Sequence, residues 1–165
     1  AAEAAYGELT AAGIEVVLNT VVERRNVADL PGAAAHIVAR HLGGLARPTL
    51  VCFSHPGSYL RDADYERQLA PLDEVAPNLV AALRTLSAAG IDTETSGTCG
   101  FPICVLAAAP ELMGPTPTSS FDHDHAPDRV FVDACDGCGW RSRCFGLRRR
   151  YVAKLGARGV TPLRG

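Results

Sequence analysis

Three cysteines lie within ten residues in the stretch "CDGCGWRSRC", which runs from Cys135 to Cys144. Two residues separate Cys135 from Cys138, and Cys144 follows after five more. Thiolates this closely spaced, in a polar loop that contains glycines, are typical ligands of zinc or of iron–sulfur clusters, and both groups commonly take four ligands. Three local sulfurs therefore predict a fourth ligand from a distant part of the chain.

The fourth ligand has several candidates. Cys104 lies in the short apolar segment "FPICVL", where Pro102 stiffens the chain, and Cys99 is the reserve candidate. His123 and His125 of the "DHDH" stretch are the ligands that would complete a zinc site of three cysteines and one histidine. Zinc modules usually add a second close cysteine pair, which is missing here, so the spacing favours a cluster with a remote fourth thiolate. The predicted ligands are four cysteines: Cys104, Cys135, Cys138 and Cys144.

Basic residues gather beside these cysteines. Residues 139–165 contain eight of the sixteen lysines and arginines and no acidic residue, and the run Arg148 to Arg150 follows Cys144 closely. The run has two interpretations: it offsets the negative charge of a thiolate-bound cluster, or it forms the solvated face of a helix. Trp140, between Cys138 and the basic stretch, is expected to shield the metal loop from solvent.

Length and composition indicate a globular chain. With 165 residues, 47% hydrophobic residues and a net charge of -2, the chain can bury a core and predicts one domain or slightly more. It shows neither a signal-peptide pattern nor an apolar stretch of the roughly 20 residues that cross a bilayer. We expect a cytoplasmic protein without a membrane partner, in which closely spaced cysteines bind metal more often than they form disulfides. Cys52, between Val51 and Phe53, is expected to be a buried strand residue.

The elements that must position the cysteines follow a βα pattern in the first half of the chain. The β-branched run 13–22 predicts a strand buried on both faces, and 27–44 predicts a helix that begins near Asp29. A second strand is expected from residue 48, a helix over 71–90, and a short strand over 91–95. Strands that alternate with helices predict a parallel sheet with crossover helices.

The second half has a different composition. We expect a boundary near residue 97. It divides the chain into an α/β part, residues 1–96, and a small unit that its metal-ligating residues hold together, residues 97–165. Only a short strand over 129–134 and a helix over 143–156 are expected there.

The stretch "CDGCGWRSRCFGLRRRYVAKLG", preceded by "FPIC", resembles the auxiliary-cluster region of radical S-adenosylmethionine (radical SAM) proteins of the SPASM and Twitch type. In that family a CxxC pair and a later cysteine are followed by glycine, an aromatic residue and a further glycine. The matching positions in this chain are Cys135, Cys138, Cys144, Gly146, Tyr151 and Gly156.

The upstream half is similar to the same family. "GIEVVLNTVVERRNVADLP" resembles its fifth barrel strand and the turn after it. The resemblance implies an α/β fold, namely the C-terminal portion of a partial parallel (β/α) barrel followed by a small irregular iron–sulfur cluster domain. It also implies that Asn19 and Thr20, at the end of their strand, contact S-adenosylmethionine.

Two departures limit the resemblance. SPASM domains carry another cysteine shortly after the third, where this chain has Arg148, and six cysteines are too few for two auxiliary clusters. A single Twitch-like [4Fe-4S] cluster fits better. The family's CxxxCxxC loop, which binds the catalytic cluster and S-adenosylmethionine, is absent from the 165 residues and is expected to precede Ala1, so these residues alone are not expected to perform the radical reaction.

The leading hypothesis is therefore the C-terminal part of a radical SAM enzyme. Its auxiliary cluster relays electrons, or binds substrate if one iron lacks a protein ligand. The resemblance implies S-adenosylmethionine and a second [4Fe-4S] cluster in the full-length protein, a peptide or small-molecule substrate, and an electron donor such as a flavodoxin or ferredoxin. One alternative is a zinc-stabilised nucleic-acid-binding module whose basic C-terminal helix follows phosphates, although it leaves the α/β half unexplained and aromatic residues are few, at 6%. A plain iron–sulfur electron carrier is the third hypothesis.

Overall fold

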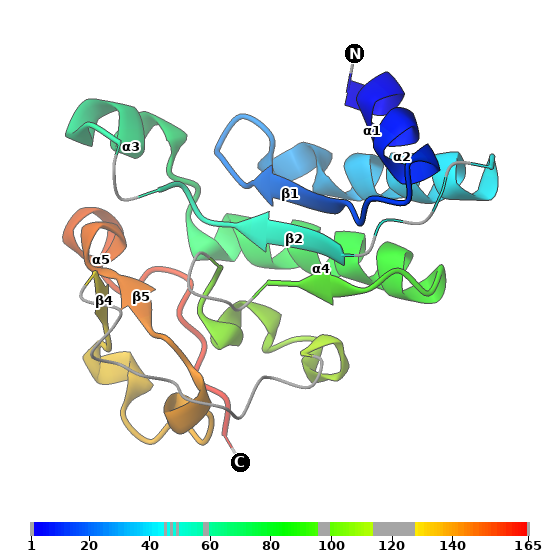
Figure 1. Cartoon of the computed structure of the whole chain (residues 1–165). Helices are drawn as coiled ribbons and strands as arrows, with labels where there is room; N and C mark the ends of the chain where they lie inside the picture. Colours follow the sequence, from blue (N-terminus) through cyan, green and yellow to red (C-terminus); the bar gives the residue numbers. More distant parts are fainter. Residues whose placement is uncertain are drawn as a thin grey trace.

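The chain folds into an α/β structure with a three-stranded parallel sheet and a two-stranded antiparallel sheet (Figure 1). The computed structural model describes residues 2–44, 46, 48, 50–57, 60–95, 100–113 and 128–164.

The parallel sheet has the order β1-β2-β3, with β1 (Val17–Val21), β2 (Leu50–Ser54) and β3 (Thr93–Glu94). Helix α2 (Leu30–Leu42) connects β1 to β2, and helix α4 (Leu72–Ala88) precedes β3. The predicted parallel sheet with crossover helices is confirmed. The described strands form an open three-stranded sheet, and the partial barrel that the resemblance implies stays a prediction.

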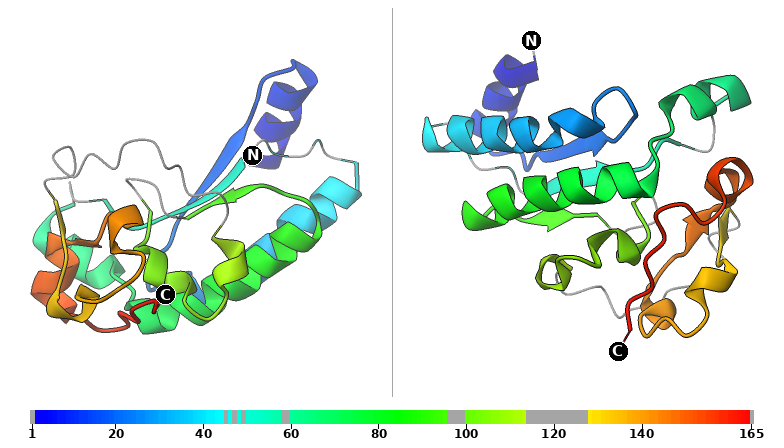
Figure 2. Two further views of the ribbon diagram at one scale, coloured as in Figure 1. Left: turned by 90° about the horizontal axis from the view of Figure 1, so that it is seen from below. Right: turned by 180° about the vertical axis from the view of Figure 1, so that it is seen from behind.

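Helices α2 and α4 pack side by side against one face of this sheet, as the front view of Figure 1 and the rear view of Figure 2 both show. Val51 and Phe53 of β2 are buried in the core with Leu79, Leu83 and Leu86 of α4. These three leucines lie three or four residues apart, so a single helical stripe supplies much of the core.

Strand β1 corrects one expectation. The run 13–22 was expected to be buried on both faces, but Val17 is 53% exposed and Val21 is 38% exposed. The reason is position, because β1 is an edge strand and α2 and α4 cover only one face of the sheet. Helix α1 (Ala2–Ala11) lies beyond the outer side of β1 (Figure 1).

The segments between the strands include a helix that the sequence did not indicate. Helix α3 (Asp62–Gln68) lies between β2 and α4, with Asp62 and Asp64 in its first turn. A 3-10 turn, η1 (Val27–Asp29), precedes α2. Asp29 is the N-terminal flanking residue of α2, but its side chain makes no capping hydrogen bond, and Pro31 occupies the first turn instead.

The second half is built from short elements. The described residues of this half include the 3-10 turns η2 (Ile103–Leu106), η3 (Pro110–Leu112), η5 (Asp133–Cys135) and η6 (Arg141–Arg143). Strands β4 (Arg129–Val130) and β5 (Leu147–Arg148) pair antiparallel, and helix α5 (Arg149–Leu155) follows directly. The predicted strand and helix of this half both exist but are shorter than expected.

One hydrophobic core continues across the expected boundary near residue 97. Ile103, Val105 and Leu106 of η2 belong to the same buried cluster as the leucines of α4. Side chains of the two parts pack in one core, so the structure shows no separation between them. The division into residues 1–96 and 97–165 stays a prediction. Among the described residues, no helix has the length and apolar character needed to cross a bilayer.

Candidate metal centre

The four cysteines predicted as ligands line one cavity. Cys104 comes from η2, and the other three come from a segment about thirty to forty residues further along the chain. Apolar residues form most of the remaining wall: Pro102, Ile103, Phe131, Leu147, Val160 and Pro162. The convergence of two distant segments on one cavity is the arrangement that the spacing of the cysteines predicts.

Short turns bring the three local cysteines to this cavity. Cys135 ends η5, Gly137 adopts a positive φ of 74° immediately before Cys138, and Cys144 follows η6. The backbone amide of Cys138 donates to the carbonyl of Cys135 over 3.2 Å, which closes the turn between the two thiols. Cys135 and Cys138 are partly exposed, whereas Cys104 and Cys144 are buried.

Gly146 fixes the position of Cys144 against strand β4. Its φ is +75°, and a Cβ at this position would lie 2.6 Å from the carbonyl oxygen of Val130. Only glycine fits such a close approach with this backbone conformation. Its amide also donates to the sulfur of Cys144 over 3.3 Å. Steric contact with Val130 therefore explains why glycine follows the third cysteine, and the N–H of this glycine also donates to a thiol.

Burial holds the two inner thiols in the neutral form. It raises the pKa of Cys104 to about 12, against a hydrogen bond from the backbone of Thr161, and the three other cavity cysteines raise it further. Burial likewise raises the pKa of Cys144, opposed by backbone hydrogen bonds from Ile103 and Gly146. Metal ligands must be deprotonated, so these thiols ionise only if a cation compensates their charge.

The donor set suits a soft metal. Four sulfurs in an apolar wall match zinc or an iron–sulfur cluster, and no carboxylate is among the described residues that line the cavity. Backbone N–H groups that point at the sulfurs are the interactions that tune cluster potentials. The residues present therefore fit a thiolate-bound centre.

Binding nevertheless requires the side chains to rearrange. Among the described residues, no three His, Cys, Asp or Glu side chains are gathered closely enough to hold a metal ion, and the cavity between the four thiols offers about 20 Å³. That is about the room of one water molecule. The partly exposed turn that carries Cys135, Gly137 and Cys138 is the part that has freedom to adjust, because Cys104 and Cys144 are fixed in the core.

The other predicted ligand candidates, Cys99, His123 and His125, lie outside the described residues. Cys104 is the candidate that the structure places in the cavity.

The arginine run divides between the two interpretations only in part. Arg148 is buried and pairs with Asp128, and Arg150 is partly buried and pairs with Asp62 on α3. Neither is among the residues that line the cysteine cavity, whereas Arg149 at the start of α5 is exposed, as a solvated helix face predicts. Arg141 instead lines the cavity, with its guanidinium carbon 4.8 Å from the centre of the Phe131 ring. Trp140 packs against the core and under the guanidinium of Arg143.

The tail of the chain also helps to form the cavity, which the sequence did not reveal. Val160 and Pro162 belong to its wall, and the amide of Gly139 donates to the carbonyl of Leu163 over 2.8 Å. The tail runs back beside the cysteine turns in both Figure 1 and Figure 2. The apolar residues that follow the basic helix in the sequence were the feature that could have indicated this contribution of the tail to the cavity wall.

The predicted cofactor-binding residues Asn19 and Thr20 lie near the carboxyl end of β1, which ends at Val21, and their contact with S-adenosylmethionine stays a prediction. Thr20 pairs in register with Phe53, which is buried against the helices, and neighbouring strand residues point to opposite faces. Of these two residues, therefore, Asn19 lies on the face away from α2 and α4 and Thr20 does not.

That face carries a row of polar groups. Asn19, Cys52 and Glu94 are in register across the three strands. Cys52 was expected to be buried but is partly exposed; burial, followed by the charge of Glu94, raises the pKa of its thiol.

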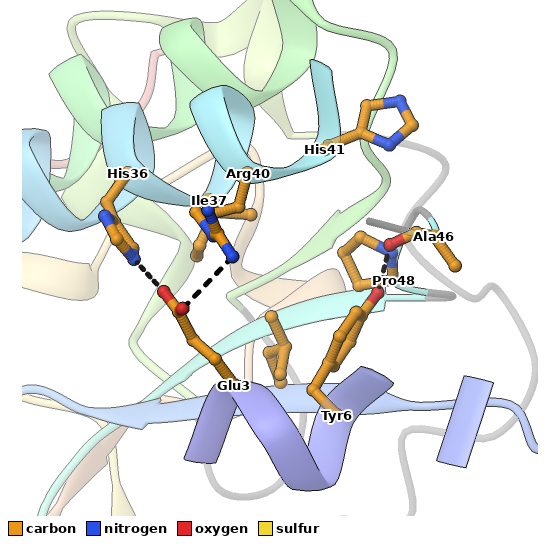
Figure 3. A pocket seen from close by; sticks show the side chains of 9 residues that line it. Glu3, Tyr6, His36, Ile37, Arg40, His41, Ala46 and Pro48 are labelled. Atoms are coloured by element: carbon orange, nitrogen blue, oxygen red, sulfur yellow. Dashed lines mark hydrogen bonds and ion pairs between the residues drawn. The ribbon is translucent and has the colours of Figure 1, made fainter. Parts of the chain in front are cut away.

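A second cavity lies far from the cysteines, between α1, α2 and β1 (Figure 3). It measures about 150 Å³ and has an apolar lining that includes Leu18 and Ile37. Glu3 closes its rim through ion pairs with His36 (2.7 Å) and Arg40 (3.3 Å). Its charged groups thus satisfy one another.

A scan against protein-family models, a search of curated proteins and a search of solved structures each gave no match.

Proposed function

We propose that this chain is the C-terminal part of a radical SAM enzyme and that Cys104, Cys135, Cys138 and Cys144 bind an auxiliary [4Fe-4S] cluster. The observation that carries the proposal is the shared cavity, because a random set of cysteines has no reason to converge from two distant segments on one apolar wall.

The parallel sheet supports the barrel part of the proposal. The helices cover one face, while the apolar Val17 and Val21 of the edge strand are substantially exposed. Parallel sheets are normally covered on both faces, and apolar edge strands invite pairing. In a barrel the sheet curves so that this face becomes the interior, where further strands would enclose Val17 and Val21, and Asn19 would lie on the inner face.

The roles of the chain's own residues follow from their positions. Four thiols are available, so the cluster would have a protein ligand at each iron, which favours electron relay over substrate binding. Ile103, Phe131 and Leu147 exclude water, and the amide of Gly146 donates to a ligand sulfur. When bound, the cluster supplies one-electron transfer. The proposal implies a peptide or small-molecule substrate and an electron donor such as a flavodoxin or ferredoxin.

The ion pairs argue against the nucleic-acid alternative. A helix that follows phosphates needs free cations. In this structure Arg148 pairs with Asp128, Arg150 with Asp62, and Lys154 with Glu66, and Arg158 pairs with two acidic residues of α4. These basic side chains are therefore paired within the chain, with Asp128 of the second half and with acidic residues of α3 and α4 in the first half.

Cysteine replacement tests the ligand set. Cys104→Ser should remove most of the iron bound after anaerobic reconstitution, because a hydroxyl is a poor ligand for a soft centre. Cys52→Ser is the matched control, since Cys52 lies in β2 and outside the cavity, and it should retain the iron content of the wild type. An unchanged iron content in Cys104→Ser would refute the proposed ligand set.

A further inference from the structure

One charged side chain belongs to the wall of the cysteine cavity. Among the described residues that line it, only Arg141 carries a charged side chain, and the others are the four cysteines, Gly146 and apolar residues. Arg141 lies between two of the proposed ligands in the chain. Its backbone amide donates to the carbonyl of Cys138 over 3.1 Å, and its carbonyl accepts from the amide of Cys144 over 3.2 Å. The turn that presents these two thiols therefore also fixes the place of Arg141.

Two contacts hold the guanidinium group of Arg141. Its central carbon lies 4.8 Å from the centre of the Phe131 ring, and Phe131 is itself part of the cavity wall. Its Nη1 donates to the carboxylate of Asp136, the residue after Cys135. The side chain of Asp136 is 73% exposed, and Asp136 is not among the described lining residues. The positive end of this ion pair therefore lies at the cavity, and the negative end lies in solvent.

A metal centre in this cavity needs a compensating cation. Four thiolates carry more negative charge than Zn²⁺ or an oxidised [4Fe-4S] core offsets, so either centre is an anion. An anion in a largely apolar wall is costly to form unless a cation lies close to it. The sequence indicates the run Arg148 to Arg150 for this purpose, but none of these three arginines is among the described residues of the wall. Arg141 is, and its guanidinium is charged at every working pH.

We propose that Arg141 is the residue that compensates the negative charge of the thiolate-bound centre. Its positive charge favours formation of the centre and, if the centre is a cluster, favours uptake of an electron, because reduction makes the anion more negative. The effect on an electron-transfer cluster rests on the proposed function. The effect on metal affinity does not, since it holds for any centre that these thiolates form.

Zn²⁺ is the probe that tests Arg141 without iron. The reduced, metal-free chain is titrated with Zn²⁺ against a chromogenic chelator at fixed pH, and the bound ion replaces the thiol protons to leave an anionic site. Arg141→Gln should raise the Kd for Zn²⁺ about fivefold at low ionic strength, the size of one good ion pair at a partly exposed site. Arg141→Lys keeps the charge and should stay within about twofold of the wild type. An unchanged Kd in Arg141→Gln, or the same loss in Arg141→Lys, would overturn the proposal.

The salt dependence separates a charge effect from a structural one. At about 1 M salt the screening length falls to about 3 Å, so the ratio of the two Kd values should approach one. Loss of the packing between Arg141 and Phe131 would not respond to salt in this way. A ratio that stays near fivefold at high salt would therefore contradict charge compensation.

Arg143→Gln is the matched control. Arg143 belongs to the same turn, η6, and its guanidinium carbon lies 4.8 Å from the centre of the Trp140 ring, but it is not among the described lining residues. The variant removes the same charge only two residues away and should change the Kd for Zn²⁺ by less than about twofold. Equal losses in Arg141→Gln and Arg143→Gln would show a general effect of basic charge and would overturn the assignment to Arg141.

The reduction potential of the reconstituted chain tests the same charge on a cluster. Arg141→Gln should lower the equilibrium constant for reduction about fivefold, which is about 40 mV at 59 mV per tenfold change, and Arg143→Gln should not. A cluster that forms but keeps its potential in Arg141→Gln refutes the role of Arg141 and leaves the proposed function intact. A wild-type chain that binds no iron refutes the proposed function, and the zinc measurement then still decides on Arg141.

Discussion

His55 makes the stability of this protein depend on pH in a way that can be measured. The ring is enclosed by Tyr65, Phe101 and Tyr151, and its Nδ1 lies 3.3 Å from the carbonyl oxygen of Pro56. Burial lowers the pKa of His55 to about 3; the bond to Pro56 acts in the opposite direction, and the charge of Arg148 lowers the pKa further. The folded protein therefore keeps this imidazole neutral at pH values where the unfolded chain would bind a proton.

The size of the effect follows from this difference. An unperturbed histidine has a pKa of about 6.5, so below pH 6.5 the unfolded state gains one proton that the folded state does not take up. The free energy of unfolding is then lowered by about 1.4 kcal/mol for each pH unit. The contribution of His55 is fully present above pH 6.5 and is lost as the pH falls toward 3. Between pH 6.5 and pH 5 it amounts to about 2 kcal/mol.

Urea unfolding from pH 7.5 to pH 5, followed by the fluorescence of Trp140 and by circular dichroism, measures this loss. His55→Phe retains an aromatic ring in the pocket, and His55→Gln retains a donor for Pro56, but neither titrates. At pH 7.5 we expect His55→Phe to lie within about 1 kcal/mol of the wild type, since one long hydrogen bond is lost. Both variants should lose about 2 kcal/mol less than the wild type on acidification. Equal losses in all three proteins would show that His55 is not held neutral and would refute the reasoning.

Further predictions concern the glycine turns and Tyr151. Gly146→Ala should lower the free energy of unfolding by about 3 kcal/mol or more, because a Cβ meets the Val130 carbonyl at 2.6 Å in addition to the strain of a positive φ. Gly137→Ala has the same type of backbone but meets nothing within 4 Å, so about 1–2 kcal/mol is expected; equal losses in urea unfolding would contradict the steric argument. Tyr151→Phe should lower the same free energy by about 1–3 kcal/mol, since the buried amide of Leu72 loses its acceptor, and an unchanged urea midpoint would show that this bond is dispensable.

Local patterns were sufficient to predict most of the fold's first half. The leucine stripe of α4 and the Gly43–Gly44 end of α2 are features of a few consecutive residues, and the structure has both. The exposure of Val17 was not predictable in the same way, because burial of a strand depends on its neighbours and not on its own sequence. Helix α3 was missed because its seven residues hold only a single buried side chain, Tyr65.

The candidate metal centre likewise combines local features that the sequence predicts with tertiary contacts that it does not. The spacing of Cys135, Cys138 and Cys144 indicates a shared centre, and the structure places Cys104 in the same cavity. The partners of the arginines could not be inferred, since Asp62 and Asp128 come from other segments and pair with Arg150 and Arg148 only through the tertiary fold. A run of basic residues in a sequence shows where positive charge lies, but it does not show which acidic residues will form the ion pairs.

Metal analysis of the anaerobically reconstituted chain, together with its absorption spectrum, tests the central claim most directly. A cluster held by the four cavity cysteines predicts about four irons per chain and a broad band in the visible region. Zinc at about one equivalent without visible absorption would contradict the claim and would establish the zinc-bound alternative.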